Sequence, residues 1–264
     1  MHLRKRHIAA ASLISLSLVA APAIAQDSNS SSASSKLKAP KNKKPQTDWT
    51  KRVRQSKIGG HVMGNPLAKS RIAEYVSYTC NHCATFEAQS TKLLRSKYIA
   101  SGKISMEVRN LARDPVDLTV AMLARCGGKK RFFELHNSFL VTQSTWLSRS
   151  RFASRPVQQS WYAGDFASRH HNISTFFGFY GIMETLGFSR EKVKKCFAKE
   201  KERKKILAMT EHAQKNLQIT GTPGFTINDK VIKKVHDWNR LKPVLENALN
   251  PAPPKKKQLQ GKIL

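Results

Sequence analysis

Alternating and continuous apolar runs predict a sheet in the first part of the folded chain. Residues 70–78 and 103–111 carry strand patterns, and a helical pattern over residues 79–100 joins them. A weaker apolar segment at residues 58–63 is expected to form a first strand at the sheet edge. The order of strand, helix and strand indicates an α/β sheet domain.

The pattern becomes almost entirely helical over residues 114–218. Asp114 can cap the first of these helices, and Pro115 suits its first position. Strand character then returns, with a hairpin predicted around residues 228–229, and Asp237 can cap a last helix. The sequence therefore predicts an α/β sheet domain that a helical insertion divides into two parts.

The two ends of the chain lack the pattern of a packed core. Residues 1–25 combine a basic start, an apolar run and a small-residue cleavage site, which predicts a secretory signal peptide too short to span a membrane. Residues 26–57 are rich in Ser, Lys and Pro and are predicted to be a disordered linker, and residues 251–264 a basic disordered tail. No later segment is apolar enough to cross a bilayer, so export to the periplasm is expected.

The formal charge of the chain is +30, and loss of the signal peptide, with three basic and no acidic residues, would leave +27. Solvated basic ends account for part of this charge. It also suits loose contact with anionic lipid headgroups or other envelope polyanions. Export disfavours nucleic acid as a partner.

Cys80 and Cys83 are three positions apart at the predicted start of a helix, so their sulfur atoms can meet on one helix face. Free N–H groups at a helix start favour a thiolate there. A structural disulfide or half of a zinc site would use the same spacing. Zinc needs a second close pair, which Cys126 and Cys196 do not form in sequence, and a c-type haem needs histidine where this chain has Ala84. The context favours redox chemistry without a metal or cofactor.

The segment EYVSYTCNHC at residues 74–83, with Phe86 and Glu87 beyond it, resembles the DsbA family of thiol–disulfide oxidoreductases. The helical insertion and the sequence Gly-Thr-Pro at residues 221–223 belong to the same resemblance. It spans roughly residues 58–249. Its motifs are specific, because a C-x-H-C sequence lies between a strand and a helix and a distant Thr-Pro precedes another strand.

The resemblance implies a thioredoxin fold with a helical domain inserted between an N-terminal βαβ part and a C-terminal ββα part. These parts would be residues 58–112, 113–218 and 219–250. Isomerases of this type usually carry an N-terminal dimerisation domain. The segment between the signal peptide and the sheet is too short for one, so a monomer is expected.

The resemblance also implies roles for the residues around the two cysteines. Cys80 corresponds to a nucleophilic, solvent-exposed thiol, and Cys83 to the resolving thiol. The imidazole of His82 is expected to hydrogen-bond the Cys80 thiolate and lower its pKa, which makes the disulfide a better oxidant. Glu74 is implied to assist proton transfer from beneath the dithiol, and Glu87 is a second acid considered for that role.

Two further pairs follow from the resemblance. A cis peptide bond between Thr222 and Pro223 would leave the backbone of Thr222 free to pair with a substrate peptide. Some family members carry a second disulfide in the insertion. Cys126 and Cys196 are therefore predicted to form a structural disulfide, although four cysteines alone permit three pairings.

The leading hypothesis is an exported oxidase that introduces disulfides into reduced exported substrate proteins through Cys80 and Cys83. A quinone-linked, DsbB-like membrane partner would reoxidise the pair. Asn81 replaces the proline usual in the family, which leaves the net direction open. The alternatives are an isomerase or reductase of the same fold, and a non-enzymatic basic protein that binds the envelope.

Overall fold

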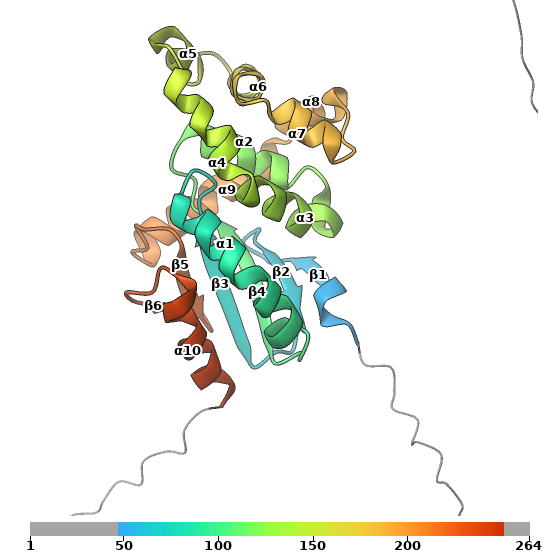
Figure 1. Ribbon diagram of the computed structural model, residues 1–264, viewed down its shortest axis with the longest axis vertical. Helices are drawn as coiled ribbons and strands as arrows, with labels where there is room; N and C mark the ends of the chain where they lie inside the picture. Colours follow the sequence, from blue (N-terminus) through green and yellow to red (C-terminus); the bar gives the residue numbers. More distant parts are fainter. Residues whose placement is uncertain (1–46, 251–264) are drawn as a thin grey trace, which may run out of the picture. The chain divides into compact units, whose positions relative to one another are not determined.

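A computed structural model describes residues 47–250 of the chain. Its centre is a six-stranded sheet in the order β1-β2-β4-β3-β5-β6 (Figure 1). β3 and β4 are parallel, and every other neighbouring pair is antiparallel. The strands are β1 (Val53–Gln55), β2 (His61–Gly64), β3 (Ser70–Val76), β4 (Ile104–Asn110), β5 (Gly224–Ile227) and β6 (Lys230–Ile232).

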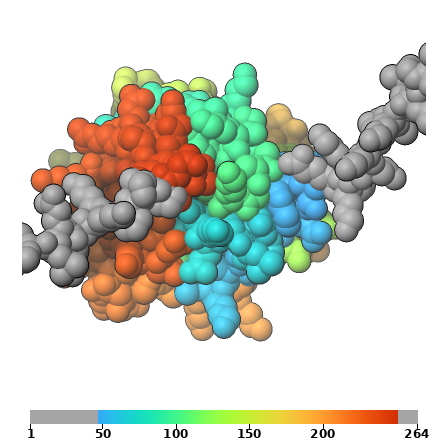
Figure 2. Space-filling model, turned by 90° about the horizontal axis from the view of Figure 1, so that it is seen from below, coloured from blue at the N-terminus to red at the C-terminus, as the bar shows by residue number. Residues whose placement is uncertain are grey.

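Both faces of β3 are buried, which explains its nearly continuous apolar pattern. On one face lie α1 (Asn81–Leu93), its continuation η2 (Leu94–Ile99) and α10 (Trp238–Leu249). There the ring of Phe86 packs on the rings of Phe225 and Trp238, at centroid distances of 4.9 and 6.3 Å. On the other face Tyr75 packs with Ala213. Seen from the end of the sheet away from the insertion, α10 (red) lies beside the green segment that contains η2 (Figure 2).

Between β4 and β5 the chain forms the helical insertion (Figure 1). Asp114 caps its first helix by accepting a hydrogen bond from the backbone N–H of Asp117, and Pro115 occupies the first helical turn, as predicted. The elements are α2 (Pro115–Ala124), α3 (Gly128–Val141), α4 (Gln143–Leu147), η3 (Ser148–Phe152), α5 (Arg155–Ser160), α6 (Phe166–Phe177), α7 (Phe179–Thr185), α8 (Arg190–Phe197), α9 (Glu200–Glu211) and η4 (His212–Asn216). The expected α/β fold with an inserted helical part is confirmed.

Arg125, at the end of α2, ties the insertion to the sheet. Its side chain is buried, and it donates hydrogen bonds to Oδ1 of Asn110 in β4 and to the carbonyl oxygen of Gly59. It also forms an ion pair of 3.1 Å with Glu202 of α9. A buried cation needs such partners, so the two parts of the chain share one polar centre.

The predicted linker over residues 26–57 is wrong in its last part. Trp49–Lys51 form a 3-10 turn, η1, and Val53–Gln55 form β1, which pairs with β2. β2 is therefore an inner strand, and the expectation of an edge strand at residues 58–63 is wrong as well. Charged side chains suit an exposed edge, so the basic residues around β1 gave it the composition of a linker.

The predicted signal peptide, the first part of the predicted linker and the predicted basic tail lie outside the described residues. Within residues 47–250, no helix has both the length and the apolar character that a membrane crossing requires.

Candidate active site

The turn between β3 and α1 carries both sulfur atoms of the C-x-x-C motif. Cys80 is the cap residue of α1, and its carbonyl oxygen accepts hydrogen bonds from the N–H groups of Cys83 and Ala84, at 3.1 and 3.3 Å. Cys80 and Cys83 are free thiols in the structure. The helix start thus directs its unpaired N–H groups toward the Cys80 side chain.

The helical insertion holds this turn in place. Asp117 of α2 accepts a hydrogen bond of 2.7 Å from the backbone N–H of Tyr78, and Asp114 accepts one of 2.7 Å from the hydroxyl of Thr79. Gln143, at the start of α4, donates to the carbonyl oxygens of Tyr78 and Cys80, at 2.7 and 3.0 Å. Every one of these groups comes from beyond the sheet domain, so the insertion shapes the thiol site directly.

The sequence prediction missed Asp117 and Gln143. Asp117 could have been predicted from the sequence, because an acidic residue three positions after a cap residue is typical of a helix start. In the structure it accepts a hydrogen bond of 3.0 Å from the backbone N–H of Arg113. Gln143 carried none, since its contacts are with residues more than 60 positions away.

The Thr222–Pro223 segment lies against the Cys80 thiol. Its peptide bond is cis, and the carbonyl oxygen of Thr222 is 3.1 Å from the Cys80 sulfur. The carbonyl oxygen of Pro223 accepts a hydrogen bond of 2.9 Å from Nδ1 of His236, which anchors this loop to the segment before α10. Only 6% of Cys80 is exposed, so the expectation of a solvent-exposed thiol is wrong: this loop and the insertion cover it.

The pKa of Cys80 is lowered to about 5. The largest cause is a hydrogen bond from the Cys83 thiol; burial acts against it, and the Thr222 side chain and the N–H groups of Cys83 and His82 add to the lowering. The nearby Thr222 carbonyl oxygen favours the protonated thiol, but these donors outweigh it. Cys80 is therefore a thiolate at neutral pH.

His82 contributes through its backbone, which corrects the prediction made for its imidazole. The side chain is exposed, and within residues 47–250 it forms no hydrogen bond with Cys80. Because Cys80 caps the helix, the side chain of the second helical residue points outward while its N–H faces the sulfur.

Cys83 and Glu74 lie buried behind the turn. Burial raises the pKa of Cys83 well above its usual value, and its hydrogen bond to Cys80 acts in the same direction. Burial likewise raises the pKa of Glu74, and the negative charges of Glu87 and Cys80 raise it further. Oε1 of Glu74 has no hydrogen-bond partner among the described residues. The surroundings of Glu74 therefore favour its protonated form.

Glu87, in contrast, is kept ionised. Burial alone would raise its pKa, but the charge of His136 and the amide of Asn137 lower it to about 2. Asn137 donates at 2.9 Å, and Nε2 of His136 lies 3.6 Å from the carboxylate. Glu74, Glu87 and His136 line a cavity of about 30 Å³, which has room for about one water molecule. The pKa values of two acids beside the same cavity are thus shifted in opposite directions, that of Glu74 upward and that of Glu87 downward.

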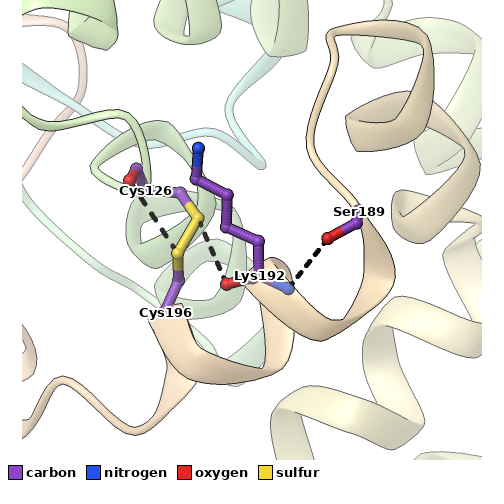
Figure 3. Close-up of a disulfide and its surroundings, with 4 residues drawn as sticks. All are labelled: Cys126, Ser189, Lys192 and Cys196. Carbon is purple, nitrogen blue, oxygen red and sulfur yellow. Dashed lines mark hydrogen bonds between the residues drawn. A yellow bond between two sulfur atoms is a disulfide. The ribbon is translucent and has the colours of Figure 1, made fainter.

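Cys126 and Cys196 are joined by a disulfide in the insertion (Figure 3). Their Cα atoms are 5.4 Å apart, within the ordinary range for such a bond. Ser189 caps α8 by accepting a hydrogen bond of 3.3 Å from the N–H of Lys192, one turn before Cys196. The bond joins the end of α2 to α8 and lies apart from the free thiols.

A groove of about 560 Å³ begins beside the dithiol turn. One wall consists of Asn81 and Thr85 of α1, and the other includes Ser144 of α4 and Arg151 of η3. The groove is open, and its lining mixes polar groups with apolar side chains such as Leu140, Val141 and Leu147, so it can receive an extended chain without a demand for one particular side chain.

Comparisons with known proteins agree with this geometry. The thioredoxin family model matches residues 56–247. A protein-disulfide oxidoreductase of Rickettsia conorii is 29% identical over 205 residues, which cover 77% of this chain and 66% of that protein. A similar protein of Rickettsia typhi is 30% identical over 63% of this chain and 54% of its own length. The chain thus spans between about half and two thirds of these curated relatives.

Two solved structures extend the likeness. The crystal structure of a protein-disulfide isomerase from Novosphingobium aromaticivorans has 38% sequence identity and a TM-score of 0.70, and it covers 72% of this chain and 97% of that one. Wolbachia pipientis alpha-DsbA1, with 21% identity and a TM-score of 0.57, covers 72% of this chain and 90% of that one and shares the fold. The chain therefore belongs to the thioredoxin family.

Proposed function

We propose that this protein introduces disulfides into substrate proteins through Cys80 and Cys83. The observation that carries the proposal is that the pKa values of two thiols within one helical turn are shifted in opposite directions. The pKa of Cys80 is lowered to about 5, and that of Cys83 is raised well above its usual value. Such a pair holds one stable thiolate leaving group and one protonated thiol, which is the arrangement of a dithiol oxidant.

In the proposed reaction, a substrate thiolate attacks the Cys80 sulfur of the Cys80–Cys83 disulfide. The bond between the two protein sulfurs breaks, a mixed disulfide forms on Cys80, and Cys83 leaves with the electron pair and takes up a proton. A second substrate thiolate then attacks the substrate sulfur of the mixed disulfide, and Cys80 leaves as a thiolate. The substrate loses two electrons, which the protein disulfide gains.

Glu74 is proposed to supply the proton that Cys83 takes up and to remove it in the reverse step. It is buried near Cys83, and burial raises its pKa and so favours its protonated form. Thr222 is proposed to pair with an extended substrate segment, because its backbone lies beside the Cys80 sulfur. Cys126 and Cys196 are proposed to be structural.

Oxidation is favoured over isomerisation or reduction by the low pKa of Cys80, since a stable thiolate makes the reduced state the preferred one. Isomerisation or reduction is the alternative, because one of the solved relatives is named a protein-disulfide isomerase. A periplasmic location, reduced exported proteins as substrates, a monomeric state and reoxidation by a quinone-linked, DsbB-like membrane protein complete the proposal. A non-enzymatic envelope-binding role would not require the opposite pKa shifts of the two thiols.

The test combines the redox equilibrium of the Cys80–Cys83 pair against glutathione with oxidative refolding of a reduced substrate. We expect a potential more oxidising than that of glutathione and refolding that Cys80→Ser abolishes with the fold intact. A pair more reducing than glutathione would reject the oxidase and leave the reductase. Unchanged refolding by the Cys80→Ser variant would reject dithiol chemistry altogether.

A further inference from the structure

The segment that faces the dithiol turn across the groove has an unusual composition. Residues 135–183 hold four arginines, no lysine and a single acidic residue, Asp165, which caps α6. Elsewhere the chain is rich in lysine. Arginine presents a planar set of donors that matches phosphate oxygens, whereas lysine acts as a strongly hydrated point charge. The composition therefore suits oxyanions that accept paired hydrogen bonds, such as phosphate or carboxylate, more than a general attraction to anions.

One aromatic side chain projects from this segment. Phe152, at the end of η3, is 82% exposed. Among residues 47–250 no ring packs on it and no cation lies over it, whereas the partly exposed Phe166 is covered by Arg203 at 3.7 Å. Exposure of an unpartnered ring of this size to water is unfavourable, and its transfer to an apolar boundary is favourable.

Exposed arginines flank this ring in the sequence. Arg149, Arg151 and Arg155 are exposed, and none of them forms an ion pair within the described part of the chain. Their positive charge is therefore available to an outside partner. An aromatic ring flanked by unpaired arginines is the combination that binds the interface of an anionic bilayer: the ring enters the boundary and the guanidinium groups bind phosphates.

From these observations we propose that η3 and the start of α5, residues 148–155, dock the protein on an anionic phospholipid surface. An acidic polypeptide is the less favoured partner, because it would need a pocket of its own for Phe152. Arg151 and Asn81 line the same groove. Docking therefore brings the Cys80 side of the molecule to the membrane surface, a property independent of the redox reaction.

Two tryptophan variants of the full chain test the contact. Phe152→Trp and Leu67→Trp both replace exposed apolar residues, 82% and 87% exposed, but Leu67 lies in the turn before β3, at the end of that strand away from Cys80. After subtraction of the wild-type signal, vesicles of brominated phosphatidylcholine and phosphatidylglycerol should quench the fluorescence that Phe152→Trp adds. The fluorescence that Leu67→Trp adds should stay unchanged.

Lipid composition supplies the control for this measurement. Vesicles without phosphatidylglycerol should quench neither added indole, because the arginines then have no anionic surface to bind. Equal quenching in the two variants, or quenching in Leu67→Trp alone, would overturn the proposal.

A charge-matched pair of variants separates this segment from the basic ends of the chain. Arg151→Gln with Arg155→Gln should weaken partition into the anionic vesicles roughly 25-fold, about fivefold for each arginine. Lys129→Gln with Lys130→Gln removes the same charge from exposed positions at the start of α3 and should change partition less than twofold. Equal weakening by both pairs would assign binding to net charge and reject the segment.

A third arm addresses the competing partner and the active site. Suppose that polyglutamate binds with the same dependence on Arg151 and Arg155, while vesicles leave the fluorescence of the Phe152→Trp variant unquenched. That result would assign the segment to acidic polypeptides and overturn the lipid proposal. The redox potential of the dithiol should be the same in the Phe152→Trp variant, the Leu67→Trp variant and the double lysine variant as in the wild type. This result separates a failure of docking from a failure of the proposed oxidase.

Discussion

Two cysteines one helical turn apart differ in pKa because their surroundings differ. Cys80 caps the helix, where N–H groups and the Cys83 thiol donate to its sulfur. Cys83 is fully buried and acts as the donor, so its charged form is disfavoured. The hydrogen bond between them acts in opposite directions on the two groups.

The thiolate of Cys80 should titrate with a midpoint near pH 5, measured by the ultraviolet absorbance of the reduced protein. Because the Cys83 thiol makes the largest contribution, Cys83→Ala should raise that midpoint by roughly one to two pH units. Cys80→Ala is the control and should remove the transition. A midpoint unchanged by Cys83→Ala would show that the helix start alone sets the pKa.

The same pKa sets the stability of the reduced protein. The folded pKa lies below the unfolded value, so the thiolate adds stability that is complete above the unfolded pKa and is lost as pH falls toward 5. At pH 7 the gain is about 2–3 kcal/mol, or about 60 mV of oxidising potential. Denaturant titrations should show the reduced-minus-oxidised stability difference shrinking by that amount from pH 7 to pH 5; a difference independent of pH would contradict the assignment.

Glu74→Gln should slow formation of the mixed disulfide, the step in which Cys83 takes up a proton, on the order of 100-fold and leave stability nearly unchanged. Burial disfavours the charged carboxylate and its Oε1 has no partner among the described residues, so an uncharged isosteric amide replaces it at little cost. Stopped-flow reduction and denaturant unfolding measure the two effects. Glu211→Gln, at an exposed position, is the matched control. Equal rates in the two variants would remove Glu74 from proton transfer.

At the scale of elements, the start of α2 governs the turn that carries Cys80. Asp117 is buried and accepts the N–H groups of Tyr78 and Arg113. Burial raises its pKa to about 7 in spite of these hydrogen bonds. A group that titrates near pH 7 therefore lies in the first turn of α2. It contacts the backbone of Tyr78, two residues before the reactive Cys80.

Asp117 should make the protein less stable as pH rises from about 4 to 7. Its pKa is raised from 3.8 to about 7 on folding, so the folded state binds a proton that the unfolded state has lost, and ionisation costs up to about 4 kcal/mol over that window. The Asp117→Asn variant cannot ionise, so its stability should not depend on pH in this way. It should be less stable by a constant amount at every pH, because the amide has one acceptor oxygen fewer. Urea unfolding at several pH values checks it, and parallel slopes in the two proteins would contradict the raised pKa.

The sequence predicted elements that local chemistry determines. The hairpin at Asn228 and Asp229 formed as expected, because both residues adopt the positive φ values, 48° and 65°, that such a turn requires. β1 was missed because its three residues gain strand character only by pairing with β2. The role of Gln143 could not be predicted, since two carbonyl groups distant in sequence define it.

At the scale of the whole molecule, the disulfide between Cys126 and Cys196 closes a separation of 70 residues within the insertion. Cys126→Ala with Cys196→Ala should therefore lower the free energy of unfolding by about 2–4 kcal/mol. Thermal or denaturant unfolding with Cys80 and Cys83 held reduced measures it. The Cys80–Cys83 bond is the internal comparison, because its reduction should stabilise the fold; a loss of stability on reducing that pair would contradict the expected contrast.

The hydrogen bonds from Asp114, Asp117 and Gln143 have a consequence for protein engineering. The sequence C-N-H-C cannot be transferred to another protein by itself, because groups from the helical insertion form hydrogen bonds with the backbone of the turn that carries it. Grafted onto a thioredoxin scaffold without the insertion, the four residues would keep their order but lose the partners of the Tyr78 N–H and of the two carbonyl oxygens. The transferable unit is the motif together with the start of α2 and the start of α4, which must be moved as one piece.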